Sequence, residues 1–512
     1  MPLFSRKDRR HRVMYDAHSW VGVTVGLALY LMFFTGVVAL FHHPIAGWED
    51  PALHRPGPAT EQAWVDGLLR VAPPDAKRII ITFPEPEEGL HGPSGYIEHP
   101  AGSFQEYNWV ADAWSPRRSG AAEFLNHLHF LWHERAAWLM VVAGLISVAL
   151  LVAITSGVVI HVRDLVAQWR QFRPARPPLV TWTDLHKVTG VLSLPFSYLM
   201  AYTGALIIFA TALMGLVAAP VYGADDARIR EIVTGPALPD PEPLVKGAVV
   251  RPVADWVAAG EAAVPGLDVM LVEQWVGSSR VRVGGSVAGQ RGFIEAHLDG
   301  TSGRVLEAED PDDRRPAEAA TNLIYALHFG TAGGWGNKVV YALMALVAAA
   351  SFISGNAMWL LRRRKKGLAG RGTAFLESCT YGVGTGLPLA TALILLGTQV
   401  LPFDLEARVA VLELGFLGAL VAAVVWASQA NNRWRTAAHQ MGLAALLFAT
   451  LPFWRPGGLV GGGPVSLLAV ELGWLTMSAL CGFVSVRMHQ RATSPTAERR
   501  AARAMKEAPS RG

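Results

Sequence analysis

Five histidines stand at the ends of long apolar segments of this 512-residue chain, where their imidazoles could bind a metal. His18 and His186 each precede an apolar segment, and His161 ends another. His129 and His328 each precede an apolar segment as part of a repeated Leu-His-Phe tripeptide. Neutral imidazole offers a nitrogen lone pair, and ionisable groups at such positions are functional candidates. A single interfacial histidine is more often an anchor, but five at span ends favour metal ligation, since four of them occupy corresponding positions of the repeat and His161, whose counterpart is Trp359, is an additional one.

The spacing of these histidines separates them into two layers. His129 and His161 are 32 residues apart, about 48 Å along a helix, so one ligand cannot join them. Two facing imidazoles inside a helix bundle are what a b-type haem requires. We therefore expect two haems b. Symmetry assigns His129 and His328 to the outer haem, while three residues, His18, His161 and His186, compete for the two axial positions of the inner haem.

The segments that must position these histidines are apolar enough to cross a membrane. Hydrophobic residues make up 51% of the chain, and the mean hydropathy is +0.29, both high for a soluble protein. A membrane helix needs about 20 apolar residues. The qualifying segments are 19–41, 137–160, 188–219, 339–361, 374–402, 409–428, 437–454 and 463–486. The predicted fold class is a mostly α membrane protein with eight transmembrane helices.

The first four of these segments repeat one pattern. His18 aligns with His186, and Thr35-Gly36 aligns with Thr203-Gly204. The second and fourth segments both carry a late Ser-Gly pair. The unit is a His-led span, an external module, Leu-His-Phe and a second span, and it occurs twice. We expect small residues to let the helices pack around a cofactor; these are Gly22, Gly36, Gly157, Gly190, Gly204 and Gly355.

Positive charge predicts the orientation in the membrane. Lys and Arg gather before the first segment, in every second connection, including "RRRKK" at 362–366, and in the tail. This bias places both termini in the cytoplasm of an inner-membrane, multi-pass protein. The net charge of +4 is thus explained by topology, and we expect the lipid bilayer, not nucleic acid, as a partner.

Two long connections fall on the predicted outer side and read as small α+β modules. Helical spacing appears at 61–73 and 252–264, and strand patterns appear at 76–83, 104–110, 267–276, 279–287 and 291–298. The predicted organisation is a leader with span one at 1–43, module one at 44–126, spans two and three at 127–219, module two at 220–327, span four with a basic loop at 328–371, spans five to eight at 372–487 and a basic tail at 488–512.

The motifs together resemble a known family of bacterial membrane proteins. They are "DAHSWVGV…FFTGVVALF", "LHF…ITSGVVIHVRD", "TWTDLHKVTGVLSLPFSYLMAYTGALIIF" and "YALHFG…ISGNAMWLLRRRKK". This combination resembles the PepSY-associated transmembrane proteins, which include iron-regulated and ferrisiderophore-reductase members. The resemblance implies PepSY-like external modules and an oxidoreductase that reduces a periplasmic ferric siderophore or other ferric chelate. One departure is Ser197, since related members often have a histidine near this position.

Other functions stay open at this level. The chain has no nucleotide or flavin fingerprint, so electrons would come from quinol or from a separate cytoplasmic reductase. One alternative is an interaction or regulatory protein without redox activity, whose histidines are interfacial anchors. Another is a transporter, which the repeats and the embedded acids Glu377, Glu413 and Glu471 would suit. Against a transporter, the repeats are parallel and no broken helix at the membrane midplane is evident.

Overall fold

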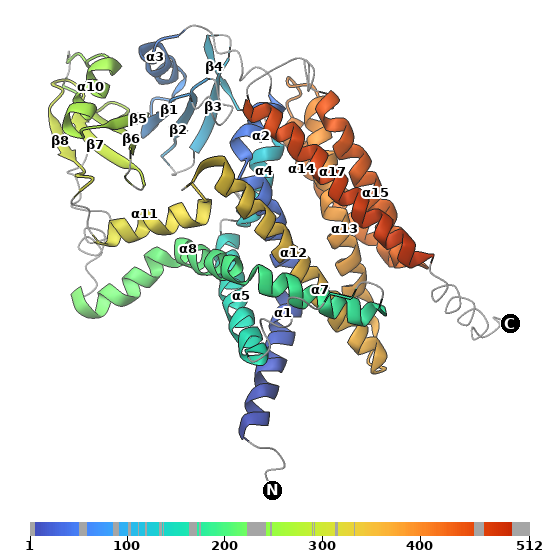
Figure 1. The fold of residues 1–512 in the computed structure, drawn as a ribbon. Helices are drawn as coiled ribbons and strands as arrows, with labels where there is room; N and C mark the ends of the chain where they lie inside the picture. The colour runs from blue at the N-terminus through green and yellow to red at the C-terminus, as the bar shows by residue number, and fades with distance from the viewer. Residues whose placement is uncertain are drawn as a thin grey trace. The chain divides into compact units, whose positions relative to one another are not determined.

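The computed structural model divides the chain into two compact units (Figure 1). Unit 1 comprises Met1–Glu49, Ser119–Ala201 and Tyr341–Gly512, and unit 2 comprises Asp50–Arg118 and Tyr202–Val340. The structure describes residues 6–50, 59–84, 92–100, 104–110, 112–117, 120–132, 136, 138–162, 172–173, 176–222, 242–245, 248–288, 290, 292–312, 316–331, 333–454 and 465–493. It leaves out the side chains of 6–8, 210–222, 316–318 and 465, and most of the predicted basic tail lies outside these ranges.

Apolar helices lie at the positions that hydropathy predicts, so the protein is a multi-pass membrane protein. Within the described residues, seven helices are long and apolar enough to cross a membrane. They are Arg9–Ala39, Leu139–His161, Gly334–Lys365, Arg371–Val400, Arg408–Gln429, Arg433–Phe453 and Ser466–Ala492. A bent helix pair would make the eighth span if it crosses as one unit. The predicted membrane class is confirmed, and the count is seven or eight.

The bent pair differs from the single uninterrupted span predicted at 188–219. Helix α7 (Pro178–Leu192) and helix α8 (Leu194–Tyr222) meet at Ser193, and their axes differ by 65°. Pro195 explains the break, because proline lacks the N–H that a continuous helix would need and its ring clashes with the preceding turn. The aligned position in the first repeat is Leu27, which lies in an unbroken helix. The break lies near the start of the predicted span, so the prediction of one uninterrupted helix over 188–219 was wrong there.

Three helices of unit 1 pack around the first histidine-bearing span. Helix α1 (Arg6–Ala39) packs along α5 (Leu139–His161) and against the short helix α4 (Ala121–His129). Helix α2 (His42–Glu49) also packs on α4. The fully buried Glu49 accepts a hydrogen bond of 2.7 Å from the backbone N–H of Ala122. A carboxylate at this helix end complements the helix dipole, so α2 fixes the helix that carries His129.

Helix α12 (Gly334–Lys365) is the last helix of the repeat, and most of it belongs to unit 1. The trailing helices of unit 1 that the structure describes are α13 (Arg371–Val400), α14 (Arg408–Gln429), α15 (Arg433–Thr450) and α17 (Val465–Ala492), with the short 3₁₀ turn η3 (Leu451–Phe453) after α15. Helices α13, α14, α15 and α17 pack on one another (Figure 1). The embedded Glu377 pairs with Arg433 at 2.7 Å and with Arg364. Glu377 is therefore part of an ion-pair cluster in this bundle.

A hydrogen bond to a helix carbonyl that lacks its backbone donor connects α1 to this bundle. Pro388 lies inside α13 and cannot donate to the carbonyl one turn earlier. That carbonyl belongs to Gly384, and the hydroxyl of Tyr30 on α1 donates to it at 2.7 Å. A buried carbonyl without a hydrogen-bond donor destabilises the fold. Because Pro388 supplies no N–H, the carbonyl of Gly384 takes its donor from a side chain of another helix, Tyr30 of α1.

The described residues of unit 2 form an antiparallel sheet of eight strands, in the order β4-β3-β2-β1-β5-β6-β7-β8. Strands β1 (Arg78–Thr82), β2 (Ser94–Glu98), β3 (Phe104–Val110) and β4 (Ala113–Pro116) come from the first connection. Strands β5 (Leu267–Trp275), β6 (Arg280–Val287), β7 (Ile294–Asp299) and β8 (Val305–Ala308) come from the second. All five predicted strands are present. Strands β2, β4 and β8, and the β1–β5 pairing that joins the two connections, were not predicted.

The two faces of this sheet differ in chemistry. Helices α3 (Glu61–Val71) and α10 (Val253–Ala263) contribute Leu68, Val253 and Trp256 to an apolar core with one strand face (Figure 1). On the other face, arginines and carboxylates alternate across the strands. Arg78 of β1 bonds Glu273 of β5 at 2.9 Å, and Glu273 is 2% exposed. This ion pair crosses the β1–β5 seam and holds the two connections together.

Helix α11 (Pro316–Phe329) completes the described part of unit 2 and ends in the second Leu-His-Phe tripeptide. Asn337, at the start of α12, donates a hydrogen bond of 3.1 Å to the carbonyl of Gly330. Gly330 has φ of +64°, a left-handed conformation that glycine adopts without strain. The turn after His328 is thus fixed by a glycine and a side-chain contact.

Candidate functional site: buried histidines

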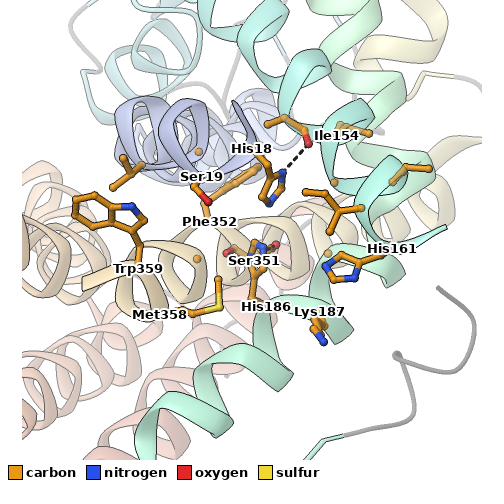
Figure 2. A pocket seen from close by; sticks show the side chains of 18 of the residues that line it. His18, Ser19, Ile154, His161, His186, Lys187, Ser351, Phe352, Met358 and Trp359 are labelled. Carbon is orange, nitrogen blue, oxygen red and sulfur yellow. Dashed lines mark hydrogen bonds between the residues drawn. The ribbon is translucent and has the colours of Figure 1, made fainter. Parts of the chain in front are cut away.

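Three of the five predicted histidines reach one cavity inside unit 1, which we call the histidine cavity. His18 comes from α1, His161 from the end of α5 and His186 from α7 (Figure 2). The cavity has a volume of about 560 Å³, within the range of roughly 300–1,000 Å³ for pockets that bind small molecules and cofactors. Phe352 and Trp359 of α12 form part of its wall. The predicted grouping of these three histidines is therefore seen as a spatial cluster.

His18 is oriented by a backbone carbonyl of the neighbouring helix. Its Nδ1 lies 2.8 Å from the carbonyl oxygen of Ala153 (dashed line in Figure 2). A carbonyl can only accept, so Nδ1 carries the proton and Nε2 keeps its lone pair. One turn later, Gly157 leaves room for the ring, because a Cβ there would lie 3.0 Å from His18 Cε1. The arrangement presents a fixed imidazole with a ligating nitrogen.

His186 repeats this arrangement in the second half of the duplication. Its Nδ1 donates to the carbonyl of Ser351 at 2.9 Å, and Ser351 aligns with Ala153. A Cβ on Gly355 would lie 3.1 Å from His186 Cε1, and Gly355 aligns with Gly157. Both repeats thus build the same unit, in which a histidine contacts a carbonyl and the glycine four residues after it.

His129 forms a third copy of the unit with the roles of the helices exchanged. It lies at the end of α4, and its Nδ1 donates to the carbonyl of Met32 on α1 at 2.7 Å. A Cβ on Gly36, four residues after Met32, would lie 2.9 Å from His129 Cε1. Burial lowers the pKa of His129, against a smaller raising effect of its backbone hydrogen bond. Neutral imidazole, the form that ligates metals, is favoured.

His328 belongs to unit 2, whereas the other four histidines belong to unit 1. Its Nδ1 shares a hydrogen bond of 2.8 Å with the hydroxyl of the buried Thr203. Thr203 aligns with Thr35, which lies between Met32 and Gly36 in the first repeat. A hydroxyl can donate or accept, so this bond leaves either ring nitrogen of His328 as the protonated one. The pairing of His129 with His328 stays a prediction.

Polar groups line the histidine cavity besides the imidazoles. Arg362 lines it and donates to the hydroxyl of Tyr15 at 2.5 Å. Lys187 lies beside His186 along the chain and also lines the cavity (Figure 2). Ser197 is buried and belongs to the same wall. The cavity therefore offers imidazoles, cationic groups and an apolar wall to one ligand.

The geometry suits a metal held by two imidazoles. The ring centroids of His18 and His186 lie 5.9 Å apart, with planes tilted by 57°. Metal–imidazole bonds of about 2 Å place the two nitrogens roughly 4 Å apart across the metal, and the ring centres lie farther out. Among the described residues, no group of three or more His, Cys, Asp or Glu side chains could hold a metal ion.

Comparison with known proteins assigns the family. Residues 15–362 match the family described as the PepSY-associated TM region. The chain belongs to this family. The matched region of this PepSY-associated membrane protein contains all five histidines and ends at Arg362, so it coincides with the duplicated part of the chain. Helices α13 to α17 follow it.

A curated relative extends the similarity beyond the matched region. An uncharacterised protein of Pseudomonas aeruginosa is 31% identical over 405 residues, which cover 70% of this chain and 93% of the relative. The two proteins are therefore similar over most of the length of the relative. This relative is uncharacterised, so the function must be argued from the site.

The carbonyls and glycines that contact the histidines were not predicted from the sequence. The glycines were expected to help helices pack, and the structure gives Gly36, Gly157 and Gly355 a sharper role against an imidazole ring. The residues that provide the accepting carbonyls, Met32, Ala153 and Ser351, share no residue type, so their identity carries no signal. Their constant spacing of four residues before a glycine is the pattern that could have revealed them.

Proposed function

We propose that this protein carries electrons across the bacterial inner membrane through two b-type haems and reduces a ferric chelate, such as a ferrisiderophore, on the periplasmic side. The observation that carries the proposal is the histidine–carbonyl–glycine unit, which recurs at His18, His186 and His129. It orients each ring and places the proton on Nδ1, so that Nε2 is the ligating nitrogen, as hydrogen-bonded partners of metal-ligating histidines do. A haem bound by two imidazoles supplies one-electron transfer.

The histidine cavity would hold the haem nearer the cytoplasm. His18 and His186 are the best-supported residues to hold it, because both carry the complete unit and their ring centroids lie 5.9 Å apart. His161 would then tune the reduction potential of the haem without ligating the iron. Arg362 and Lys187 are suited to the haem carboxylates, since charge-assisted hydrogen bonds are stronger than neutral ones. His129, with His328 as its predicted partner, would hold the second haem.

The reaction proposed for the outer side is a one-electron reduction. One electron from the protein converts the ferric ion of the chelate to ferrous, and the ferrous ion leaves its oxygen ligands more readily because its charge is lower. The sheet of unit 2, formed by the two PepSY-like connections, would position the chelate or a partner protein. The electron donor would be quinol from the bilayer or a cytoplasmic reductase. The Lys/Arg bias supports this orientation.

Haem content is the first test of this function. The detergent-purified protein from haem-replete cells should bind two haems per chain without covalent attachment and show a b-type absorption spectrum. His18→Ala, His186→Ala and His129→Ala should each lose one haem, whereas His161→Ala should keep both and shift one potential. His439→Ala, a histidine of α15 exposed at the bundle surface, is the matched control. A colourless wild-type protein would refute the electron-transfer function.

Topology is tested separately from haem binding. Reporter fusions after Ala254 and after Arg364 should report opposite compartments, periplasmic for the first and cytoplasmic for the second. The same compartment for both would contradict the proposed direction of electron flow, even if the protein binds haem.

One observation favours a different class of function. Broken helices are common at the binding sites of secondary transporters, and the bent α7–α8 pair carries the cavity residues His186, Ser193 and Ser197. In that case the cavity would bind a transported solute and the purified protein would be colourless. The same absorption spectrum therefore separates the two candidates.

A further inference from the structure

Aromatic rings connect the histidine cavity to the His129 site within unit 1. Phe352 of α12 lines the histidine cavity (Figure 2). Its ring meets the ring of Phe33 on α1 edge-to-face, with centroids 5.0 Å apart and planes at 71°. Phe33 is only 8% exposed. The edge-to-face contact is a favourable geometry for aromatic pairs, so these two side chains hold each other in fixed orientations.

Phe33 also lies next to the residue that holds His129. Met32, its neighbour in the chain, provides the carbonyl that accepts the hydrogen bond from His129 Nδ1 at 2.7 Å. The path from His129 to the cavity wall therefore consists of one hydrogen bond, the covalent bonds between Met32 and Phe33, and one ring contact to Phe352. The alternative along α1, from Met32 back to His18, is about 21 Å at 1.5 Å per residue.

The duplication supplies an internal comparison for this ring pair. Phe33 aligns with Ala201, and Phe352 aligns with Ile154, which also lines the cavity. The histidines, carbonyls and glycines of the cavity are present in both repeats, but the aromatic pair is present once. Filling the helix interface thus does not require two rings, because the equivalent positions hold aliphatic side chains.

We propose that Phe33 and Phe352 form the electronic bridge between the histidine cavity and the His129 site. This inference rests on the proposed function. Electronic coupling falls slowly along covalent and hydrogen bonds and steeply across gaps between atoms, and the ring contact leaves one gap. One electron passes from the iron at the cavity, which becomes ferric, to the iron at His129, which becomes ferrous. The rings are neither oxidised nor reduced, and no proton moves.

The matched control for Phe33 is its neighbour Phe34. Phe34 is buried to a similar extent, at 4% exposure. Its ring lies 6.1 Å from Tyr30 on the same helix, and it is absent from the cavity wall. Phe→Met keeps side-chain volume and removes the ring, a type of swap that cores tolerate at small cost. Phe33→Met and Phe34→Met therefore differ in the bridge and resemble each other in packing.

The test measures electron transfer between the two haems rather than chelate reduction. The full-length protein is reconstituted in vesicles with the sheet of unit 2 outside, and dithionite, which does not cross the bilayer, is added in a stopped-flow spectrometer. The outer haem is reduced directly in a fast phase. The inner haem is reduced only through the protein, in a slow phase. Haem content and both reduction potentials are measured for every variant, because the rate also depends on the driving force.

We expect Phe33→Met and Phe352→Met to slow the second phase several-fold with two haems bound, unchanged potentials and an unchanged fast phase. Phe34→Met and the ring-preserving Phe33→Tyr should keep the wild-type rate. The bridge is overturned if Phe33→Met equilibrates as fast as wild type, or if Phe34→Met slows it equally. A wild-type protein without haem would overturn the proposed function as well, and the two failures are thereby distinguished.

Discussion

Gly36→Ala is a sharp test of the histidine–carbonyl–glycine unit, because we expect it to lower stability whereas helix propensity alone predicts that it raises stability. Alanine in place of glycine normally stabilises a helix interior by about 0.5–1 kcal/mol. At this position the new Cβ would lie 2.9 Å from Cε1 and 3.0 Å from Nδ1 of His129, whereas ordinary contacts begin at 3.4 Å. The ring must retreat by about 0.5 Å, which stretches its 2.7 Å hydrogen bond to Met32 toward the long limit of such bonds.

The size of the expected destabilisation follows from three competing effects on stability. Overpacking a tight interface costs about 1–3 kcal/mol, and weakening the buried hydrogen bond costs about 1 kcal/mol. The propensity gain offsets about 1 kcal/mol of this, so a net destabilisation of about 1–3 kcal/mol remains. Displacing an oriented metal-ligating histidine also lowers metal-site affinity by roughly 10–100-fold. We expect a lower unfolding temperature in detergent and weaker binding of one haem.

Alanine substitutions at three other glycines provide a comparison for the effect at Gly36. A Cβ would meet the imidazole at 3.0 Å from Gly157 and at 3.1 Å from Gly355, so alanine there should have smaller effects than at Gly36. Gly418 of α14 is exposed with nothing within 4 Å of its Cβ position, so Gly418→Ala should leave stability equal or raised. The reasoning is refuted if Gly36→Ala is as stable as Gly418→Ala and binds haem with wild-type affinity.

Three further predictions concern the scaffold. Tyr30→Phe should destabilise the protein by about 1–3 kcal/mol, because it leaves a buried carbonyl without a donor. Adding Pro388→Ala should recover much of this stability by restoring a backbone N–H. A double-mutant cycle from thermal unfolding measures the coupling between the two residues. Glu273→Gln should cost about 1.5–3 kcal/mol, because Arg78 and Arg282 each lose one charged hydrogen-bond partner and keep a second carboxylate, Glu98 and Glu295 respectively, and hydrogen exchange of strands β1 and β5 should increase. Asp299 is partly desolvated, which raises its pKa, but hydrogen bonds from its turn outweigh this and lower the pKa to about 2. Its stabilisation relative to Asp299→Asn should therefore be constant at neutral pH and disappear as pH falls from about 4 to 2, as pH-dependent unfolding of the two proteins will show.

Local patterns predicted most elements because the forces that form them act locally. Long apolar segments must become helices in a bilayer, where each backbone polar group needs an internal partner, and seven of the predicted spans lie where hydropathy places them. Alternating strands β1, β3, β5, β6 and β7 were predicted for the same reason. Pro195 shows the limit of hydropathy alone, since its apolar neighbours concealed a break of 65° that the missing N–H of proline explains.

The pairing of distant segments was not predictable from these patterns. Both connections were expected as α+β modules, but the β1–β5 ladder that joins their strands depends on backbone edges that carry no residue-specific signal. The ion pair between Arg78 and Glu273 is a consequence of that register. Any other register would place these charges opposite other residues, and their types alone do not select one.

The sequence by itself determined the membrane class, the duplication and the identity of five candidate histidines, because hydropathy, repeated motifs and ionisable residues at span ends are properties of single segments. Only the tertiary structure decided that His18, His161 and His186 share a cavity and that His18, His186 and His129 each donate to a backbone carbonyl one turn before a glycine. The physical reason is that a backbone carbonyl is the same group in every residue. Which one meets an imidazole depends on how two helices pack, and packing is a property of the whole fold.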